Sequence, residues 1–249
     1  MFNAIIDFYN TATNKITTNQ LSFSNIIPNI YFHKNSPRSV VEQNCHLVIK
    51  YWKQQKTVEF LGAVAHLEQL AKSCPQHDWV ILEFLGEFVR NFTAIYPAEV
   101  NSSPDIIICQ EIQAILTLIA KIHRKKDGEK YQLDLSHTDL RGANLQKANL
   151  EGANLYHVNL AGANLSQANL TGAILSAANL DGANLVDANL AGAILSAANF
   201  NQANLTGANL YQANLYLANL QEATLNHAIF EQANLREAKF TEINPIREV

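Results

Sequence analysis

Charged residues are scarce in this chain of 249 residues, and the shortage is concentrated in its second half. Only 16% of the residues are charged, and between Gly152 and Gln221 the only charges are Asp181 and Asp187. Residues 131–249 contain 5 Lys+Arg and 10 Asp+Glu, a net charge of −5. A protein that binds nucleic acid needs a basic surface for the phosphates. The composition therefore argues against a nucleic-acid partner.

Cysteine is also scarce, with Cys45, Cys74 and Cys109 as the only three. The number is odd and no CxxC motif occurs, which favours buried free thiols in a reducing compartment. Cys74 and His77, together with Cys45 and His46, offer ligand types that zinc accepts. A cysteine at a helix start and a histidine at the surface are much commoner arrangements. We therefore expect neither a metal nor a cofactor.

Several signals for membranes and for catalysis are missing. The most apolar run, residues 106–122, is interrupted by Gln110, Glu111 and Gln113, so it is too polar to cross a bilayer. The first residues lack the basic region and cleavage site of a signal peptide. No GxSxG, HExxH, P-loop or dinucleotide fingerprint is present. We expect a cytoplasmic protein that is not an enzyme and does not bind a membrane.

What the second half does contain is a repeat of five residues. From Leu135 to Phe240 every fifth residue is Leu or Phe, at 22 positions in register. The residue two places earlier is almost always Ala, and the residue directly before is Asn in 15 of the 22 units. Neither an α-helix nor a flat strand has this period. A fixed short period of this length predicts a solenoid.

A second period gives the size of one coil. The sequence Gly-Ala-Ile-Leu-Ser-Ala-Ala-Asn occurs at 172–179 and again at 192–199, twenty residues later. Four units per coil would place Leu and Ala inside, three residues of each unit outside, and Ile174 directly beside Ile194. At the usual strand spacing the rod would be roughly 26 Å tall. Glycine recurs every ten residues from Gly142 to Gly192 and then lapses, so we expect different turns in the later coils.

The units follow the pattern A(N/D)Lxx, as in Ala143-Asn144-Leu145, Ala148-Asn149-Leu150 and Ala163-Asn164-Leu165. In this pattern the chain resembles the pentapeptide-repeat family of the bacterial, cyanobacterial type. The resemblance implies a right-handed quadrilateral parallel β-helix. Residues 61–92 and 112–119 are similar to a helical module that precedes the repeats in many bacterial members.

The first half of the sequence has the pattern of helices. Helical spacing of apolar residues predicts segments at 39–53 and 57–73, a third segment after Pro75, and a fourth at 106–124. A helical cluster on the first coil would cover its strand edges and apolar cross-section. We thus expect a two-domain α+β protein in which a helical capping domain (1–127) precedes a β-helix of about 5.5 coils (128–240) and a C-terminal cap or tail (241–249).

Five apolar or aromatic residues occupy outward positions of the repeat, where polar residues are usual. They are Tyr156, Ile174, Ile194, Tyr211 and Tyr216. Tyr is a common interface anchor, although scattered exposed apolar residues are normal. We take these five as the candidate surface for an unknown protein partner or for weak self-association.

The leading hypothesis is a non-enzymatic interaction protein, a rigid rod that presents its faces to a partner. Some members of the family mimic B-DNA and regulate DNA gyrase through a strongly acidic rod that dimerises at its C-terminal end. The nearly neutral middle of this repeat disfavours that alternative, because duplex DNA carries a charge about every 1.7 Å. A further alternative makes the helical half the recognition module and the rod a spacer.

Overall fold

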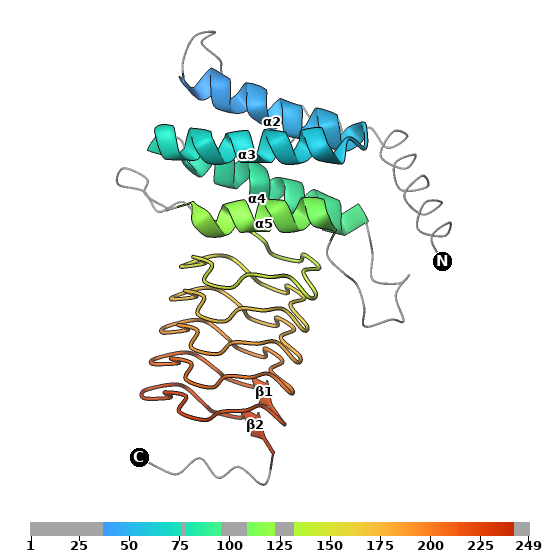
Figure 1. Cartoon of the computed structure of the whole chain (residues 1–249). Helices are drawn as coiled ribbons and strands as arrows, with labels where there is room; N and C mark the ends of the chain where they lie inside the picture. Colours follow the sequence, from blue (N-terminus) through green and yellow to red (C-terminus); the bar gives the residue numbers. More distant parts are fainter. Residues whose placement is uncertain (1–36, 76–77, 96–108, 123–131, 242–249) are drawn as a thin grey trace, which may run out of the picture.

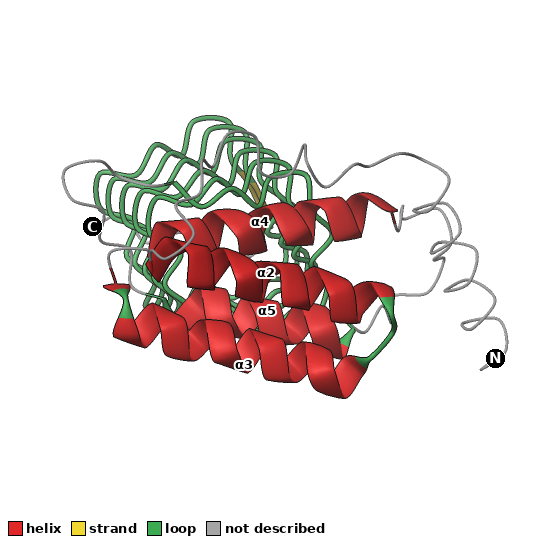
Figure 2. Cartoon of the chain, turned by 90° about the horizontal axis from the view of Figure 1, so that it is seen from above, coloured by secondary structure: helices red, strands yellow, loops and turns green. Residues whose placement is uncertain are grey.

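The computed structural model describes residues 37–75, 78–95, 109–122 and 132–241. Its helices are α2 (Pro37–Lys53), α3 (Thr57–Ser73), α4 (Asp78–Ile95) and α5 (Gln110–Lys121). They lie across one end of a rod built from the repeat (Figure 1). Seen along the rod, the helices run side by side (Figure 2).

The four helices are those that the sequence predicts. Helix α3 buries Phe60, Val64, Leu67 and Ala71, the spacing of a single helical face. Trp52 of α2 meets Phe88 of α4 edge to face, with ring centroids 5.5 Å apart. In the described part of the chain the fourth helix begins at Gln110, and the expected start at Ile106 lies outside it. None of the described helices is long and apolar enough to cross a membrane.

The rod is a parallel β-solenoid with twenty residues in each coil. Every bridge joins residues twenty apart, for example Asn144 and Asn164. The Leu145 amide donates to the Asn164 carbonyl (2.7 Å), and the Asn164 amide donates to the Ala143 carbonyl (2.8 Å). Among the described residues only β1 (Asn219–Leu220) and β2 (Lys239–Phe240) form strands, and they pair in parallel.

Units that lie twenty residues apart form what we call a stack. Stack 1 contains the units centred on Leu135, Leu155, Leu175, Leu195, Leu215 and Leu235. Stacks 2, 3 and 4 follow at five-residue steps along each coil. Coils are numbered from the helical end, so coil 1 starts with the unit of Leu135 and coil 6 with that of Leu235.

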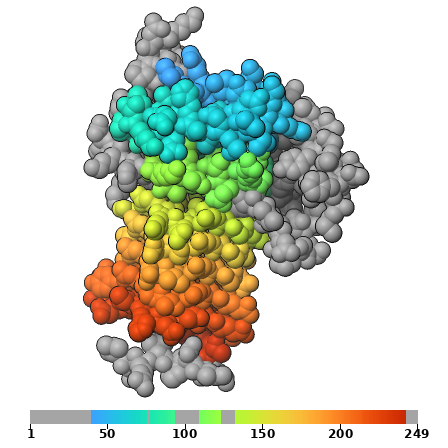
Figure 3. Space-filling view, in the orientation of Figure 1, coloured from blue at the N-terminus to red at the C-terminus, as the bar shows by residue number. Residues whose placement is uncertain are grey.

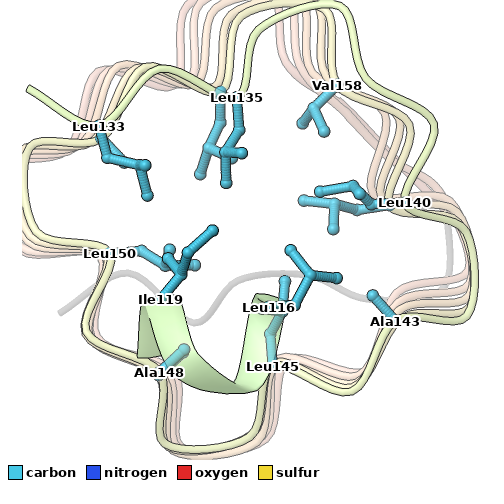
Figure 4. Close-up of a cluster of buried hydrophobic side chains, with 14 of the residues drawn as sticks. Leu116, Ile119, Leu133, Leu135, Leu140, Ala143, Leu145, Ala148, Leu150 and Val158 are labelled. Carbon is cyan, nitrogen blue, oxygen red and sulfur yellow. The ribbon is translucent and has the colours of Figure 1, made fainter. Parts of the chain in front are cut away.

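The inside of the rod is a continuous apolar column. Inward residues of coils 1 to 4, such as Leu185 and Ala183, are fully buried. Each buried Leu stabilises the fold by about 1.5–3 kcal/mol. Helix α5 closes the first coil, because Leu116 and Ile119 point into its interior and are fully buried (Figure 4). Helices and coils thus share one hydrophobic core and form one body (Figure 3).

The helices also bond to part of the backbone edge of coil 1, which has no preceding coil to pair with. The amide of the Gln113 side chain takes the place of a strand, since its Nε2 donates to the Asn144 carbonyl (2.9 Å) and its Oε1 accepts from the Asn144 amide (3.0 Å). Arg90 donates to the Asp134 carbonyl (2.9 Å), and the Ala120 carbonyl accepts from the Asn149 amide (3.4 Å). These contacts protect an edge that would otherwise pair with other strands.

The expectation of different turns in the later coils is wrong. Gln202, Gln212 and Leu217 have φ of 56°, 55° and 60°, close to the 62° of Gly182. The cause is the backbone hydrogen bonding between successive coils. The amide of Gly182 donates to the Asn201 carbonyl and that of Gln202 to the Gln221 carbonyl, so the bond to the next coil fixes the turn whatever residue stands there.

The far end of the rod is less enclosed. Leu225, Phe230, Leu235 and Phe240 of the last units are only partly buried, whereas their counterparts in earlier coils are fully buried. Almost all of the expected tail, 241–249, and the boundary at 127 lie outside the described residues.

Candidate interaction surface

Stack 1 brings four of the five candidate residues together. Ile174 and Ile194 are bridged neighbours in coils 3 and 4, as the twenty-residue repeat predicts. Tyr156 lies one coil before them and Tyr216 one coil after them. Tyr211 lies apart, in stack 4, where its hydroxyl is 3.3 Å from Oε1 of Gln232.

Exposed apolar residues of the described rod concentrate on the same stack. Four large hydrophobic side chains of the rod are exposed, namely Tyr156 (40%), Ile194 (42%), Leu217 (43%) and Ile229 (44%). The first three belong to stack 1, and only Ile229 belongs to stack 4. Sequence reasoning missed Leu217, although it stands at the second position after the central Leu, where Gly and polar residues predominate.

The isoleucines interrupt a ladder of asparagines. Eight Asn side chains of the described rod donate to the Asn of the preceding coil, as Asn184 Nδ2 does to Asn164 Oδ1 (3.3 Å), and each also accepts from the backbone amide two residues later. In stack 1 the ladder runs from Asp134 to Asn154 and resumes from Asn214 to Asn234.

Because isoleucine has no side-chain donor or acceptor, Ile174 and Ile194 give up both kinds of hydrogen bond. Each such bond contributes a net of about 0.5–1.5 kcal/mol. The rod therefore lacks these bonds at two adjacent outward positions, of which Ile174 is half-buried and Ile194 exposed. The apolar pair is not required by the repeat, which accepts Asn in the corresponding units of stacks 2, 3 and 4.

Aromatic side chains flank the apolar pair on both sides. The ring of Tyr156 lies edge-on to His137 and His157, with centroids 5.2 Å and 4.8 Å away. The hydroxyl of Tyr216 lies 3.3 Å from Oε1 of Glu237 in the next coil. Both rings are thereby supported by neighbours on the rod, which limits the entropy lost when a partner contacts them.

The electrostatics of stack 1 are neutral between its ends. Asp134 in coil 1 is paired with Arg90 of α4, at 2.6 Å between Oδ2 and Nη1. Arg236 and Glu237 stand in coil 6, and coils 2 to 5 of this stack carry no Asp, Glu, Lys or Arg. Such a surface suits apolar contact rather than the binding of a charged group.

Cys45, His46 and Cys74, which are of ligand types that zinc accepts, do not form a metal site in the described part of the chain. No group of three or more His, Cys, Asp or Glu that could hold a metal ion occurs there. Cys45 lies in α2, and its burial raises the pKa of the thiol, which keeps it protonated. Cys74 follows α3, and His77 lies outside the described part of the chain.

The family model for pentapeptide repeats matches residues 134–172, 173–212, 183–221 and 213–244, with 8 copies. Residues 134–244 are therefore pentapeptide repeats. The preceding helices lie outside the match. No curated protein matches the chain.

Solved structures, several of them of pentapeptide-repeat proteins, are similar to part of the chain. QnrB1, a plasmid-mediated fluoroquinolone resistance protein, is 19% identical, with a TM-score of 0.36 over 46% of this chain. The chain spans only 56% of the length of QnrB1. A pentapeptide-repeat protein of the Arabidopsis thaliana thylakoid lumen is 32% identical over 47% of this chain and 70% of its own, with a TM-score of 0.21.

HetL, a pentapeptide-repeat protein involved in heterocyst differentiation regulation in Nostoc sp. PCC 7120, is 28% identical. The match covers 45% of this chain and 73% of HetL, with a TM-score of 0.17. These likenesses transfer no role to this chain.

Proposed function

We propose that this protein is a non-enzymatic interaction protein whose pentapeptide-repeat rod presents stack 1 to a protein partner. The observation that carries the proposal is the replacement of the Asn ladder by Ile174 and Ile194, between Tyr156 and Tyr216. Interface cores are depleted in charge and enriched in aromatic residues. Stack 1 has both properties, and its contacts to neighbouring coils hold it in a fixed shape before binding.

The finer description of the molecule is part of the same proposal. The coils are right-handed and quadrilateral, and a helical capping domain (1–127) precedes the β-helix (128–240) and a C-terminal tail (241–249). Four units per coil support the quadrilateral form. The bonds of Gln113 and Arg90 to coil 1 support the capping role. We place the protein in the cytoplasm, where three free cysteines are stable as thiols.

A DNA-mimicking regulator of gyrase is the alternative, and the placement of the carboxylates opposes it. Mimicry of B-DNA needs closely spaced negative charges along the rod. In the rod, Asp134 is paired with Arg90 and Asp139 with Arg141. Among residues 132–241 no two Asp or Glu stand one coil apart in the same column. Excess protein should therefore leave gyrase supercoiling unchanged.

The test is affinity capture from native lysate with quantitative mass spectrometry. The decisive variant is Ile174→Asn/Ile194→Asn, which restores the repeat's own residue and completes the ladder from Asp134 to Asn234. It should fold at least as stably as the wild type and lose a partner that the wild type captures. Tyr211→Ser, in stack 4, is the matched control and should keep that partner. Equal recovery of every partner by all three baits would refute the assignment to stack 1.

A further inference from the structure

In coils 2 to 5, two of the three outward positions of stack 1 carry the same residues in either direction along the rod. The position before the central Leu carries, from coil 2 to coil 5, Asn154, Ile174, Ile194 and Asn214. The position after it carries Tyr156, Ser176, Ser196 and Tyr216. The third outward position carries His157, Ala177, Ala197 and Leu217, which is symmetric only in coils 3 and 4.

The symmetry rests on the rare residues rather than on the repeat. Asn is the usual residue before the central Leu, so Asn154 and Asn214 add little. Tyr occurs only three times in the repeat, and two of the three stand at equal distances from the Ile pair on this one stack. The centre of the pattern lies between coils 3 and 4.

A surface with the same order of residues in both directions is suited to a two-fold symmetric contact. In such an isologous interface the same patch serves both subunits, so residue i meets j and j meets i. A two-fold axis that lies between two rods and perpendicular to them makes the rods antiparallel. Coil 3 of one copy then faces coil 4 of the other, and coil 2 faces coil 5.

We propose that stack 1 binds stack 1 of a second copy of this chain, with the two rods antiparallel. The proposal rests on the proposed function of stack 1 as an interaction surface and names its occupant. Ile174 of one copy packs against Ile194 of the other, and Tyr156 packs against Tyr216. Ser176 and Ala177 face Ser196 and Ala197, small side chains that let the two surfaces approach.

Charges at the ends of stack 1 favour the antiparallel arrangement over the parallel one. With antiparallel rods, coil 1 faces coil 6, so Arg236 lies near the Asp134–Arg90 ion pair and Glu237 lies opposite the imidazole of His137. With parallel rods, Arg236 would face Arg236 of the second copy. Complementary charges at the rim set orientation and register more than affinity.

The size of the patch predicts a weak dimer. Four coils at strand spacing are roughly 19 Å tall, and the patch is one stack wide. A stable interface buries about 800 Å² on each partner, a larger surface than this patch. We therefore expect a dissociation constant of about 10 μM or weaker, in the range of transient contacts.

Sedimentation velocity of the full chain, at about 5 to 500 μM to bracket that constant, tests the dimer. The wild-type average mass should rise with concentration from 27.6 kDa towards twice that value. Ile174→Asn/Ile194→Asn should weaken association at least tenfold, while Ile229→Asn, the same change in stack 4, should leave it unchanged.

Circular dichroism melts of all three proteins check that the variants fold. A wild type that stays monomeric, or equal association by the double variant, overturns the second copy as occupant. Capture of a different protein by the wild type but not by Ile174→Asn/Ile194→Asn would then still support the proposed function.

Distances between spin labels test the orientation. A label at Lys239→Cys in coil 6, with Cys74 and Cys109 replaced by Ser, probes the separation along the rods. Antiparallel rods place the two labels five coils apart, at least about 24 Å. Parallel rods place them at the same level. A distribution of label-to-label distances centred well below about 24 Å in the associated protein would overturn the antiparallel arrangement.

Discussion

The side chain of Gln113 is the most specific point at which the helical region supports the rod. Its amide makes two hydrogen bonds with the backbone of Asn144, in the place where a preceding coil would pair. We predict that Gln113→Ala leaves both backbone groups without their protein partner. Two bonds of about 0.5–1.5 kcal/mol each set an upper range of about 1–3 kcal/mol. The site is exposed, so water replaces part of the loss and the lower half of the range applies.

Urea denaturation followed by circular dichroism measures the stability, and hydrogen exchange reports the Asn144 amide directly. Gln110→Ala is the matched control, because it makes the same change in the same helix at an exposed side chain. Alanine also gains a few tenths of a kcal/mol in helix propensity at both sites. Unchanged exchange at Asn144, or an equal loss of stability in Gln110→Ala, would refute the role of Gln113 as a substitute strand.

Three further predictions concern the rod core, the turns and the thiols. Leu185→Ala, at a fully buried position, should lower the free energy of unfolding by about 2–5 kcal/mol in urea titrations, whereas Leu235→Ala in the half-open last coil should lower it by less than half as much. Gly182→Ala should destabilise the protein by about 1 kcal/mol because φ is positive at this residue. Gly62→Ala in α3 should stabilise the protein by up to about 1 kcal/mol. A greater loss of stability in Gly62→Ala than in Gly182→Ala would contradict this prediction. Burial raises the pKa of Cys109 to about 11, so its alkylation rate, followed by mass spectrometry, should rise about tenfold per pH unit between about pH 8 and 10, and a flat profile would disprove the shift.

The period of five predicts most of the rod because each unit repeats one physical environment. The Leu and Ala of the A(N/D)Lxx pattern lie on the inside of the described coils, and the twenty-residue repeat correctly places Ile174 beside Ile194. Turn conformation could not be read from Gly alone. The bond to the next coil imposes positive φ on residues such as Gln202 as well.

How the candidate residues group on the rod was only partly predictable from the sequence. Residue type groups Tyr211 with the other four candidate residues, but Tyr211 lies in stack 4 and the other four lie in stack 1. Leu217 would have been found by comparing residues at the same position in the same stack. The role of Gln113 has no sequence signal, because a glutamine on a helix next to apolar residues is ordinary. Only the position of α5 against coil 1 gives it a partner.

Site-specific photo-crosslinking in cells of the native host tests whether stack 1 is the surface through which this protein binds. A photoreactive amino acid at Ser176, in stack 1, is compared with one at Val186, the equivalent position of the same coil in stack 3. We predict a discrete crosslinked product from Ser176 and none from Val186. A product of twice the 27.6 kDa chain identifies a second copy, and any other mass identifies a different protein. Equal products from both positions, or a product from Val186 alone, would show that stack 1 is not the binding surface.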